Sequence, residues 1–394
     1  MQYFFILGKN PILSKAEIEA VLLTLEYRTE NIEFGNNVLI VESEQEFDIE
    51  KLNNRLGGTI KIGKILGKVE NLENFEDKFF DLVNFGQGKV YFGFSLYNIG
   101  QKAPLKQLSR KLEPVAMEIK RRLREEKNVN SRWVTSRDLE LSSVIVKKNK
   151  LLENGADICF LAKDSEIIIG QTLAVQLFEE FGARDYARPG RDQLSGMLPP
   201  KLARIMVNLA KLKEDATILD SFCGSGTILQ EALLLGYKYL IGSDLNDKAV
   251  SDTTNNLDWL AEKYNLNIEQ VKIFKHDARL LVNKIEPNSI DAVITEPYLG
   301  PAIKGSEGTK QIDLIIKELD ELYLNTFNQF KTILKTGGKI IIVFPIFQIR
   351  NQSKHLVAFE KIKEMGFKAL NNDDLIYWRP NQFIWRDIII FEKE

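Results

Sequence analysis

The second half of the chain alternates short apolar runs with longer stretches whose apolar residues recur at helical spacing. The apolar runs predict four successive strands, at residues 218–220, 239–244, 271–274 and 290–294. Behind the first run, Ile228, Leu229, Ala232 and Leu233 have the spacing of a helix. Strands that alternate with helices in this way are typical of an open α/β sheet.

The first part of the chain has a different pattern, in which each helix is flanked by strands. Residues 3–7 predict a strand, and the next helix has a capping box formed by Ser14 and Glu17. A hairpin at 31–41, a helix at 49–56 and a strand at 59–66 complete the order βαββαβ, which is ferredoxin-like. Farther on, the pattern predicts strands at 91–96, 143–146, 157–161 and 166–171 and a long helix at 105–127.

The turn after the first strand of the second half is the segment most indicative of a ligand-binding site. It contains Phe222, Cys223, Gly224, Ser225 and Gly226. Glycines there let a ligand approach the backbone beyond the carboxyl end of a strand. A dinucleotide fingerprint requires a small residue where this chain has Leu229, and no Lys follows Gly226 as a Walker loop requires. The acid before the turn, Asp220, suits a cationic ligand such as the amino group of S-adenosylmethionine, and a tight turn without a ligand is the alternative.

Acids also follow the next three strands. Asp244 ends the second strand, Asp277 follows the third, and Glu296 with Pro297 follows the fourth. Asp244 lies 24 residues after Asp220, close to the separation between a nucleotide turn and a ribose-binding carboxylate. Because ligands of open α/β sheets bind beyond the carboxyl ends of the strands, we expect these acids to meet at one edge.

This combination resembles the class I S-adenosylmethionine-dependent methyltransferases, and in particular the branch that methylates exocyclic amino groups of bases. The resemblance implies a Rossmann-like fold with a seven-stranded sheet, one strand of which is antiparallel, and S-adenosylmethionine as the cofactor. We hypothesise that Asp220 meets the methionine end, Asp244 the ribose hydroxyls and Asp277 the adenine amino group. The implied cofactor-binding residues are Asp220, Phe222, Cys223, Gly224, Gly226, Asp244, Leu245, Asp277 and Ala278.

The predicted catalytic residues are Glu296, Pro297 and Tyr298. A base amino group is a weak nucleophile because its lone pair is delocalised into the ring. A carboxylate and a backbone carbonyl that accept hydrogen bonds from its N–H groups favour the transition state. In this branch the fourth strand ends in Asp or Asn, then Pro-Pro, then Tyr or Phe. Here the acid is longer by one methylene, Tyr298 takes the second Pro position and Leu299 takes that of the stacking aromatic. An inactive site is therefore the alternative.

Residues 153–157, 170–176 and 184–191 resemble a THUMP domain, the RNA-binding module of several tRNA-modifying enzymes. With the ferredoxin-like start, the whole chain resembles the THUMP-containing tRNA guanine-N2 methyltransferases that act at guanosine 10. The implied layout is a ferredoxin-like domain at 1–65, a THUMP domain at 66–185, a linker at 186–197 and a methyltransferase domain at 198–394. The implied function is methyl transfer to the N2 amino group of a guanosine in tRNA. The alternatives are a catalytically impaired protein that binds cofactor and RNA, or an enzyme that acts on another RNA or DNA base.

Basic residues are concentrated in the middle of the chain. Residues 102–150 hold fourteen Lys or Arg against six acids, although the formal net charge of the chain is −2. A local basic excess predicts a surface that binds RNA phosphates, with a solvated helix face as the alternative. The predicted RNA-binding residues are Arg121, Arg122, Arg124, Lys127 and Arg132, and the neighbouring Trp133 also favours RNA.

Composition predicts a cytoplasmic globular protein. Hydrophobic residues make up 44% and charged residues 27% of the chain, and its apolar runs are too short to cross a membrane. The N-terminus lacks the features of a secretory signal. With two Cys and two His, the sequence predicts neither a disulfide framework nor a metal site. The resemblance implies tRNA as the partner and leaves an accessory protein subunit open.

Overall fold

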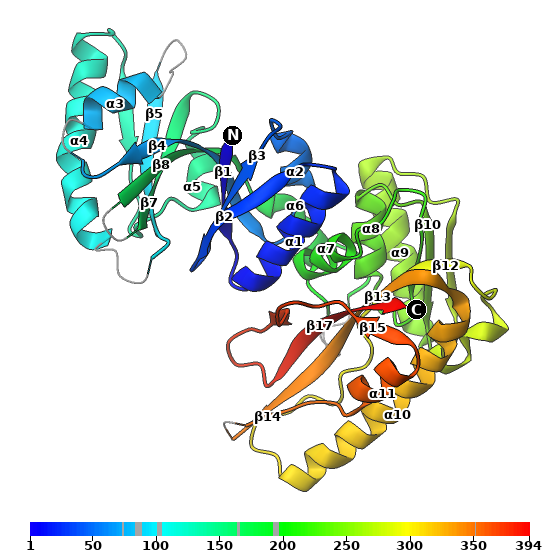
Figure 1. Ribbon diagram of the computed structural model, residues 1–394. Coiled ribbons are helices and arrows are strands. Elements are labelled where there is room, and N and C mark those ends of the chain that lie inside the picture. The colour runs from blue at the N-terminus through cyan, green and yellow to red at the C-terminus, as the bar shows by residue number, and fades with distance from the viewer. Residues whose placement is uncertain (73–74, 83–88, 101–104, 164–165, 192–196, 351) are drawn as a thin grey trace. The chain divides into compact units, whose positions relative to one another are not determined.

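The computed structural model describes residues 1–72, 75–82, 89–100, 105–163, 166–191, 197–350 and 352–394 (Figure 1). The chain forms two compact units. The first unit comprises Met1–Pro11, Glu26–Asn54 and Thr59–Phe178, and the second comprises Ile12–Leu25, Arg55–Gly58 and Glu179–Glu394. Of the helices in the described ranges, none has both the length and the apolarity that a membrane span needs.

The first unit contains an eight-stranded sheet in the order β2-β3-β1-β4-β8-β7-β5-β6. Its strands are β1 (Gln2–Leu7), β2 (Thr29–Gly35), β3 (Val38–Ser43), β4 (Thr59–Val69), β5 (Val90–Asn98), β6 (Ser131–Val134), β7 (Gly155–Lys163) and β8 (Glu166–Val175). Its helices are α2 (Ile49–Arg55), α3 (Phe75–Leu82), α4 (Leu105–Glu125) and α5 (Ser143–Lys148). Strand β4 pairs antiparallel with β8, so the strands of residues 1–65 and those of residues 66–185 share one sheet. The division of this region into two domains stays a prediction.

Two elements of the first unit differ from expectation. The strand predicted at 143–146 is wrong, because these residues begin α5. The amide of Ile145 donates to the Ser142 hydroxyl at 3.3 Å, and this N-cap outweighs the strand preference of the run Val-Ile-Val. In addition, the ring of Trp133 is only partly exposed, because it packs against Phe94 of the core with 6.3 Å between the ring centroids.

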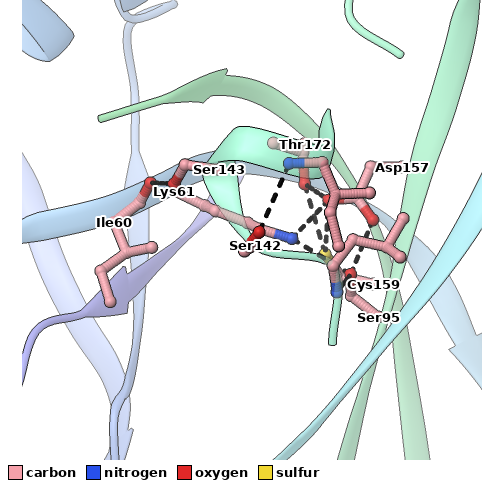
Figure 2. Close-up of polar contacts among 10 residues, drawn as sticks. Ile60, Lys61, Ser95, Ser142, Ser143, Asp157, Cys159 and Thr172 are labelled. Atoms are coloured by element: carbon pink, nitrogen blue, oxygen red, sulfur yellow. Dashed lines mark hydrogen bonds and ion pairs between the residues drawn. The ribbon is translucent and has the colours of Figure 1, made fainter. Parts of the chain in front are cut away.

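A buried polar network lies in the middle of this sheet (Figure 2). Lys61 Nζ on β4 donates to Asp157 Oδ2 on β7 at 2.6 Å and to Ser95 Oγ on β5 at 3.1 Å. Ser95 and Thr172 of β8 each donate to Asp157 at 2.7 Å. Lys61 is 1% exposed and Asp157 is 0% exposed. The network therefore joins four neighbouring strands through one fully buried ion pair.

Burial and charge oppose each other at Lys61. Burial is the largest single effect and would lower the pKa of its ammonium group. Asp157, Cys159 and Tyr97 together outweigh burial and raise the pKa above its ordinary value. Burial also raises the pKa of the Cys159 thiol to about 12, with a further increase from Asp157. The lysine in the sheet is therefore charged and the cysteine protonated at neutral pH.

The second unit is an α/β sheet of nine strands. The main path has the order β11-β10-β9-β12-β13-β17-β15, and two short strands, β14 and β16, pair with β13 and β17. These strands are β9 (Thr217–Asp220), β10 (Tyr239–Asp244), β11 (Val271–Lys275), β12 (Ile290–Thr295), β13 (Leu334–Ile349), β14 (Gln352–Lys354), β15 (Phe367–Ala369), β16 (Ile376–Tyr377) and β17 (Ile384–Lys393). The helical elements are α1 (Pro11–Thr24), α6 (Phe178–Tyr186), α7 (Pro200–Leu209), α8 (Thr227–Leu234), α9 (Asp247–Tyr264), η1 (Ala278–Asn283), α10 (Thr309–Ile333) and α11 (Ala358–Glu364).

The topology of this sheet confirms the predicted α/β class. Strands β11, β10, β9, β12 and β13 are parallel, and β17 is antiparallel to both β13 and β15. One apolar core contains α7, α8 and α9 residues, and the other contains the long helix α10, which runs beside the sheet in Figure 1. The sheet is thus covered by helices on both faces, and its parallel strands deliver their carboxyl ends to one edge.

The capping box predicted at the start of α1 is wrong. The helix begins at Pro11, so Ser14 lies inside it, and Glu17 is completely buried. The Glu17 carboxylate accepts hydrogen bonds from the amides of Gly57 and Gly58 at 2.8 and 2.7 Å and from Asn208 Nδ2 at 2.8 Å. Burial raises the pKa of Glu17 to about 7. Glu17 therefore attaches α1 to α7 within the second unit instead of capping its own helix.

Candidate active site

The turn between β9 and α8 is built on two glycines in the left-handed region. Gly224 has φ of 54° and Gly226 has φ of 76°, which side chains with a Cβ rarely adopt. A Cβ at Gly226 would lie 2.9 Å from Thr253 Cγ2, whereas a Cβ at Gly224 would meet no atom within 4 Å. Gly226 is thus required by helix packing, and Gly224 leaves open space beside the turn.

Asp244, at the end of β10, holds this turn in place. Its Oδ2 accepts from the Gly224 amide at 3.0 Å, and its Oδ1 accepts from the Asn246 amide at 2.9 Å. A carboxylate has about four lone-pair directions, so these two bonds leave capacity for ligand hydroxyls. The neighbouring Leu245 is exposed. The sequence prediction placed both residues in the cofactor site, and the structure places them at the edge of the sheet beside the glycine turn.

Asp220, at the end of β9, is a buried carboxyl with an unusual pKa. Its Oδ1 accepts from Thr295 Oγ1 at 2.7 Å and from the Phe222 amide at 3.3 Å. Burial raises the pKa of Asp220 to about 7, and the negative charges of Asp244 and Glu296 contribute to the increase. Three of the predicted acids are therefore close enough to repel one another, which makes this edge favourable for a cation.

Cys223 and Ser221 complete the turn. Burial raises the pKa of the Cys223 thiol well above its ordinary range, so it is a packing residue rather than a nucleophile. Ser221 Oγ is buried and has no hydrogen-bond partner among the described residues. An unpaired buried hydroxyl next to Asp220 fits a site that a polar ligand completes.

Asp277, which follows β11, forms its hydrogen bonds with residues of its own segment. It caps η1 by accepting from the Arg279 amide at 2.9 Å, and the Arg279 guanidinium donates to Oδ2 at 2.6 Å. These contacts, chiefly the side-chain bond, lower the pKa of Asp277. Ala278 behind it is buried. The amide of His276 donates to the Asp244 carbonyl at 2.9 Å, so the loop after β11 lies directly beside the end of β10.

Glu296 follows β12 directly and opens the predicted catalytic segment. The next residue, Pro297, is buried, whereas Tyr298 is 57% exposed. Leu299 packs against the apolar core on one face of the sheet. Of the two candidates for stacking on a base, Tyr298 is therefore the side chain that reaches solvent, and Leu299 is directed into the fold.

Sequence reasoning missed the partner of Glu296. Arg386 Nε, on the antiparallel strand β17, donates to Glu296 Oε1 at 2.5 Å. The two side chains are 10% and 14% exposed, respectively. The available signal was an arginine two residues before the apolar run 388–391, because a charge within a buried strand requires a partner.

Sequence reasoning also missed the support behind the glycine turn. Asn256 of α9 donates to the carbonyls of Ser225 and Gly190 at 2.8 and 2.9 Å. Arg188 Nη1 donates to Thr227 Oγ1 at 2.7 Å at the start of α8. Part of the predicted linker 186–197 is thus fixed to the turn, while its residues 192–196 lie outside the described residues. The motif residues Arg188 and Gly190 act here through the turn that they support.

The predicted RNA-binding residues lie in the first unit, and two of them are already paired. Arg121 forms ion pairs with Glu118 and Glu125, and Arg122 with Asp77 and Glu126. Arg124, Lys127 and Arg132 are exposed, and the described residues include no ion-pair partner for them. The beginning of the basic segment, 102–104, lies outside the described residues. The unpaired cations form the stronger candidate surface for phosphates.

Comparisons with known proteins identify similar methyltransferases. The family described as an RMKL-like methyltransferase domain matches residues 188–368, and one described as a DNA methylase matches residues 94–255. The tRNA (guanine(10)-N2)-dimethyltransferase of Methanocaldococcus jannaschii is 33% identical over 189 residues, which are 45% of this chain and 48% of that protein. The chain thus spans about half the length of this relative.

One further relative and one solved structure extend the comparison. The probable tRNA (guanine(10)-N2)-dimethyltransferase of Methanothermococcus thermolithotrophicus is 31% identical over 144 residues, 36% of this chain and 77% of that protein. The crystal structure of TrmN from Thermus thermophilus aligns with 100% of both chains at a TM-score of 0.58 and 14% identity, a likeness of fold alone. These matches confirm the predicted methyltransferase class and fold.

Proposed function

We propose that this chain, which belongs to the family of tRNA (guanine(10)-N2)-dimethyltransferases, transfers a methyl group from S-adenosylmethionine to the N2 amino group of a guanosine in tRNA. The observation that carries the proposal is the position of Glu296. It stands with Pro297 at the carboxyl end of β12, electrostatically coupled to Asp220 next to the glycine turn. The relatives' names support guanosine 10 as the target.

The acids at the sheet edge fit S-adenosylmethionine by charge and position. When bound, this cofactor supplies a methyl group on a cationic sulfonium. Asp220 would hold the ammonium of the methionine end, because a cation offsets the repulsion that this buried carboxyl experiences. Asp244 would accept from the ribose hydroxyls with its remaining lone pairs, and Asp277 would accept from the adenine amino group.

Glu296 would act on the base. Its Oε1 is held by Arg386, and its Oε2 has no hydrogen-bond partner among the described residues. Oε2 would accept a hydrogen bond from one N2–H of guanine, and the Pro297 carbonyl would accept a hydrogen bond from the other. These two bonds favour the pyramidal nitrogen of the transition state. Tyr298, exposed beside it, would stack on the base, an interaction worth about 1–3 kcal/mol. As N2 bonds the methyl carbon, the carbon–sulfur bond of the sulfonium would break and leave its electron pair on sulfur. Glu296 would accept the proton that N2 then loses.

A DNA amino-methyltransferase is the second candidate, because the DNA methylase family matches residues 94–255. That match includes the glycine turn but ends before Glu296, so it supports the cofactor site and is neutral about the base. The resemblance of residues 153–157, 170–176 and 184–191 to an RNA-binding module favours RNA.

Transfer of tritiated methyl from S-adenosylmethionine to total tRNA and to DNA, followed by nucleoside analysis, tests the proposal. We expect label in N2-methylated guanosine of tRNA, lost when guanosine 10 of a transcript is replaced by adenosine. The Glu296→Gln variant, which keeps one acceptor oxygen but loses the charge, should be slower by about 10²–10³-fold. Label in DNA, in another tRNA nucleoside or nowhere would refute the proposal.

A further inference from the structure

We propose that Arg386 is a positioning residue that fixes the carboxylate of Glu296 so that Oε2 faces the substrate amino group. This inference rests on the proposed function. It also explains how an acid longer by one methylene than the family's Asp or Asn can serve the same position.

The two residues come from neighbouring parts of the sheet. Glu296 follows β12, which pairs with β13, and Arg386 lies on β17, where it stands opposite Pro345 of β13. The guanidinium therefore reaches across one strand to meet Glu296 Oε1 at 2.5 Å. Because Arg386 is only 8% exposed and its strand is paired along both sides, its side chain has little freedom to move.

This contact constrains the carboxylate at one oxygen only. The bond comes from Nε rather than from the two-pronged end of the guanidinium, so the second carboxylate oxygen keeps its lone pairs. Glu has one more rotatable bond than Asp, and an ion pair that fixes this bond lowers the entropy lost when the substrate binds. The ion pair thus holds the carboxylate of the longer Glu side chain in one position, as the shorter Asp side chain would be held.

The positive charge of Arg386 has a second effect. Asp220 and Glu296 are close enough for their negative charges to repel each other. The guanidinium of Arg386 places the opposite charge 2.5 Å from Glu296 Oε1, and so offsets this repulsion where the two strands end.

A double-mutant cycle tests the role. Single-turnover methyl transfer to tRNA is measured for wild type, R386M, E296D and the double variant, with S-adenosylmethionine and tRNA affinities measured separately. We expect R386M to lower the transfer rate by about 10–100-fold in the wild-type background with both affinities within twofold. In the E296D background the same change should cost less than threefold, because the shorter acid does not reach Arg386.

Lys393→Met is the matched control, since Lys393 lies at the far end of β17 and donates to the Leu334 carbonyl. It should leave the transfer rate unchanged. If R386M unfolds at the assay temperature, R386K replaces it in the cycle, because Lys keeps the charge but cannot donate from the Nε position.

The outcomes separate the two proposals. Equal losses from R386M in both backgrounds, or no loss in wild type, would overturn the positioning role while the proposed function stands. Absence of transfer by the wild-type protein, or full activity of E296Q, would refute the proposed function and the positioning role with it. A loss confined to the Glu296 background supports both.

Discussion

The Thr295 hydroxyl donates a hydrogen bond of 2.7 Å to Asp220 Oδ1, and so joins the ends of two adjacent strands, β12 and β9. One strand ends in the predicted cofactor turn and the other in the predicted catalytic segment. This bond fixes the distance between the two, and positioning of donor and acceptor is the main task of a methyltransferase.

The first prediction concerns the pH dependence of cofactor binding. Burial raises the pKa of Asp220 from 3.8 to about 7, so the carboxyl is mostly neutral at pH 6 and mostly ionised at pH 8. A cationic ligand binds the ionised form, so S-adenosylmethionine affinity should rise by about tenfold from pH 6 to pH 8. Calorimetry at pH 6 in two buffers of different ionisation enthalpy should detect proton release, and Asp220→Asn should abolish both effects. A flat profile in wild type would remove Asp220 from the cofactor site.

The second prediction concerns Asp244. Asp244→Ala removes both the proposed ribose contacts and the bond to the Gly224 amide, so S-adenosylmethionine affinity should fall by more than about tenfold. Asp247→Ala is the control, because Asp247 lies in the first turn of the next helix and pairs with Lys275 at the surface. Calorimetric affinity is the measurement, and circular dichroism checks the fold. Equal affinities for the two variants would count against the ribose assignment.

The third prediction separates paired from unpaired cations in the first unit. Arg124, Lys127 and Arg132 are exposed, whereas Arg121 and Arg122 each contact two acids. Neutralising the first three should reduce the slope of log affinity for tRNA against log salt by about 2, because fewer counterions are released. Neutralising Arg121 and Arg122 should change it by less than about 1. A slope that is the same in both variants and in wild type would identify α4 as a solvated helix face.

The fourth prediction concerns the buried ion pair of the first unit. Lys61→Met leaves the Asp157 carboxylate buried without its counter-charge, which typically costs about 3–5 kcal/mol of unfolding free energy. Lys64→Met, on the same strand but paired with Glu46 near the surface, should cost at most about 1 kcal/mol. Amide hydrogen exchange of β5 and β7 peptides reports on this unit. Similar protection in both variants would show that the pair contributes little.

The sequence alone predicted the first four strands of the second unit, the helix after the first of them and the acids that follow these strands. Apolar runs that stop at Asp220 and Asp244 reveal strand ends because parallel strands are buried on both faces and turn polar only where they leave the sheet. It also determined the glycines at positive φ, since the turn chemistry is local. The predicted catalytic segment rests on the same reasoning and lies directly after β12.

Only the tertiary structure decided which distant residues act on these positions. Arg386 is 90 residues from Glu296, and Thr295 is 75 residues from Asp220, so no local pattern connects them. The same holds for Glu17, whose spacing from Ser14 predicted a local cap but whose carboxylate binds Gly57, Gly58 and Asn208 instead. The motif residue Asp157 likewise accepts from Lys61 inside a sheet, and Thr172 donates to the same carboxylate. A buried charge takes whichever partner the fold brings to it, because leaving it unpaired costs several kcal/mol, and that partner is set by strand pairing rather than by sequence spacing.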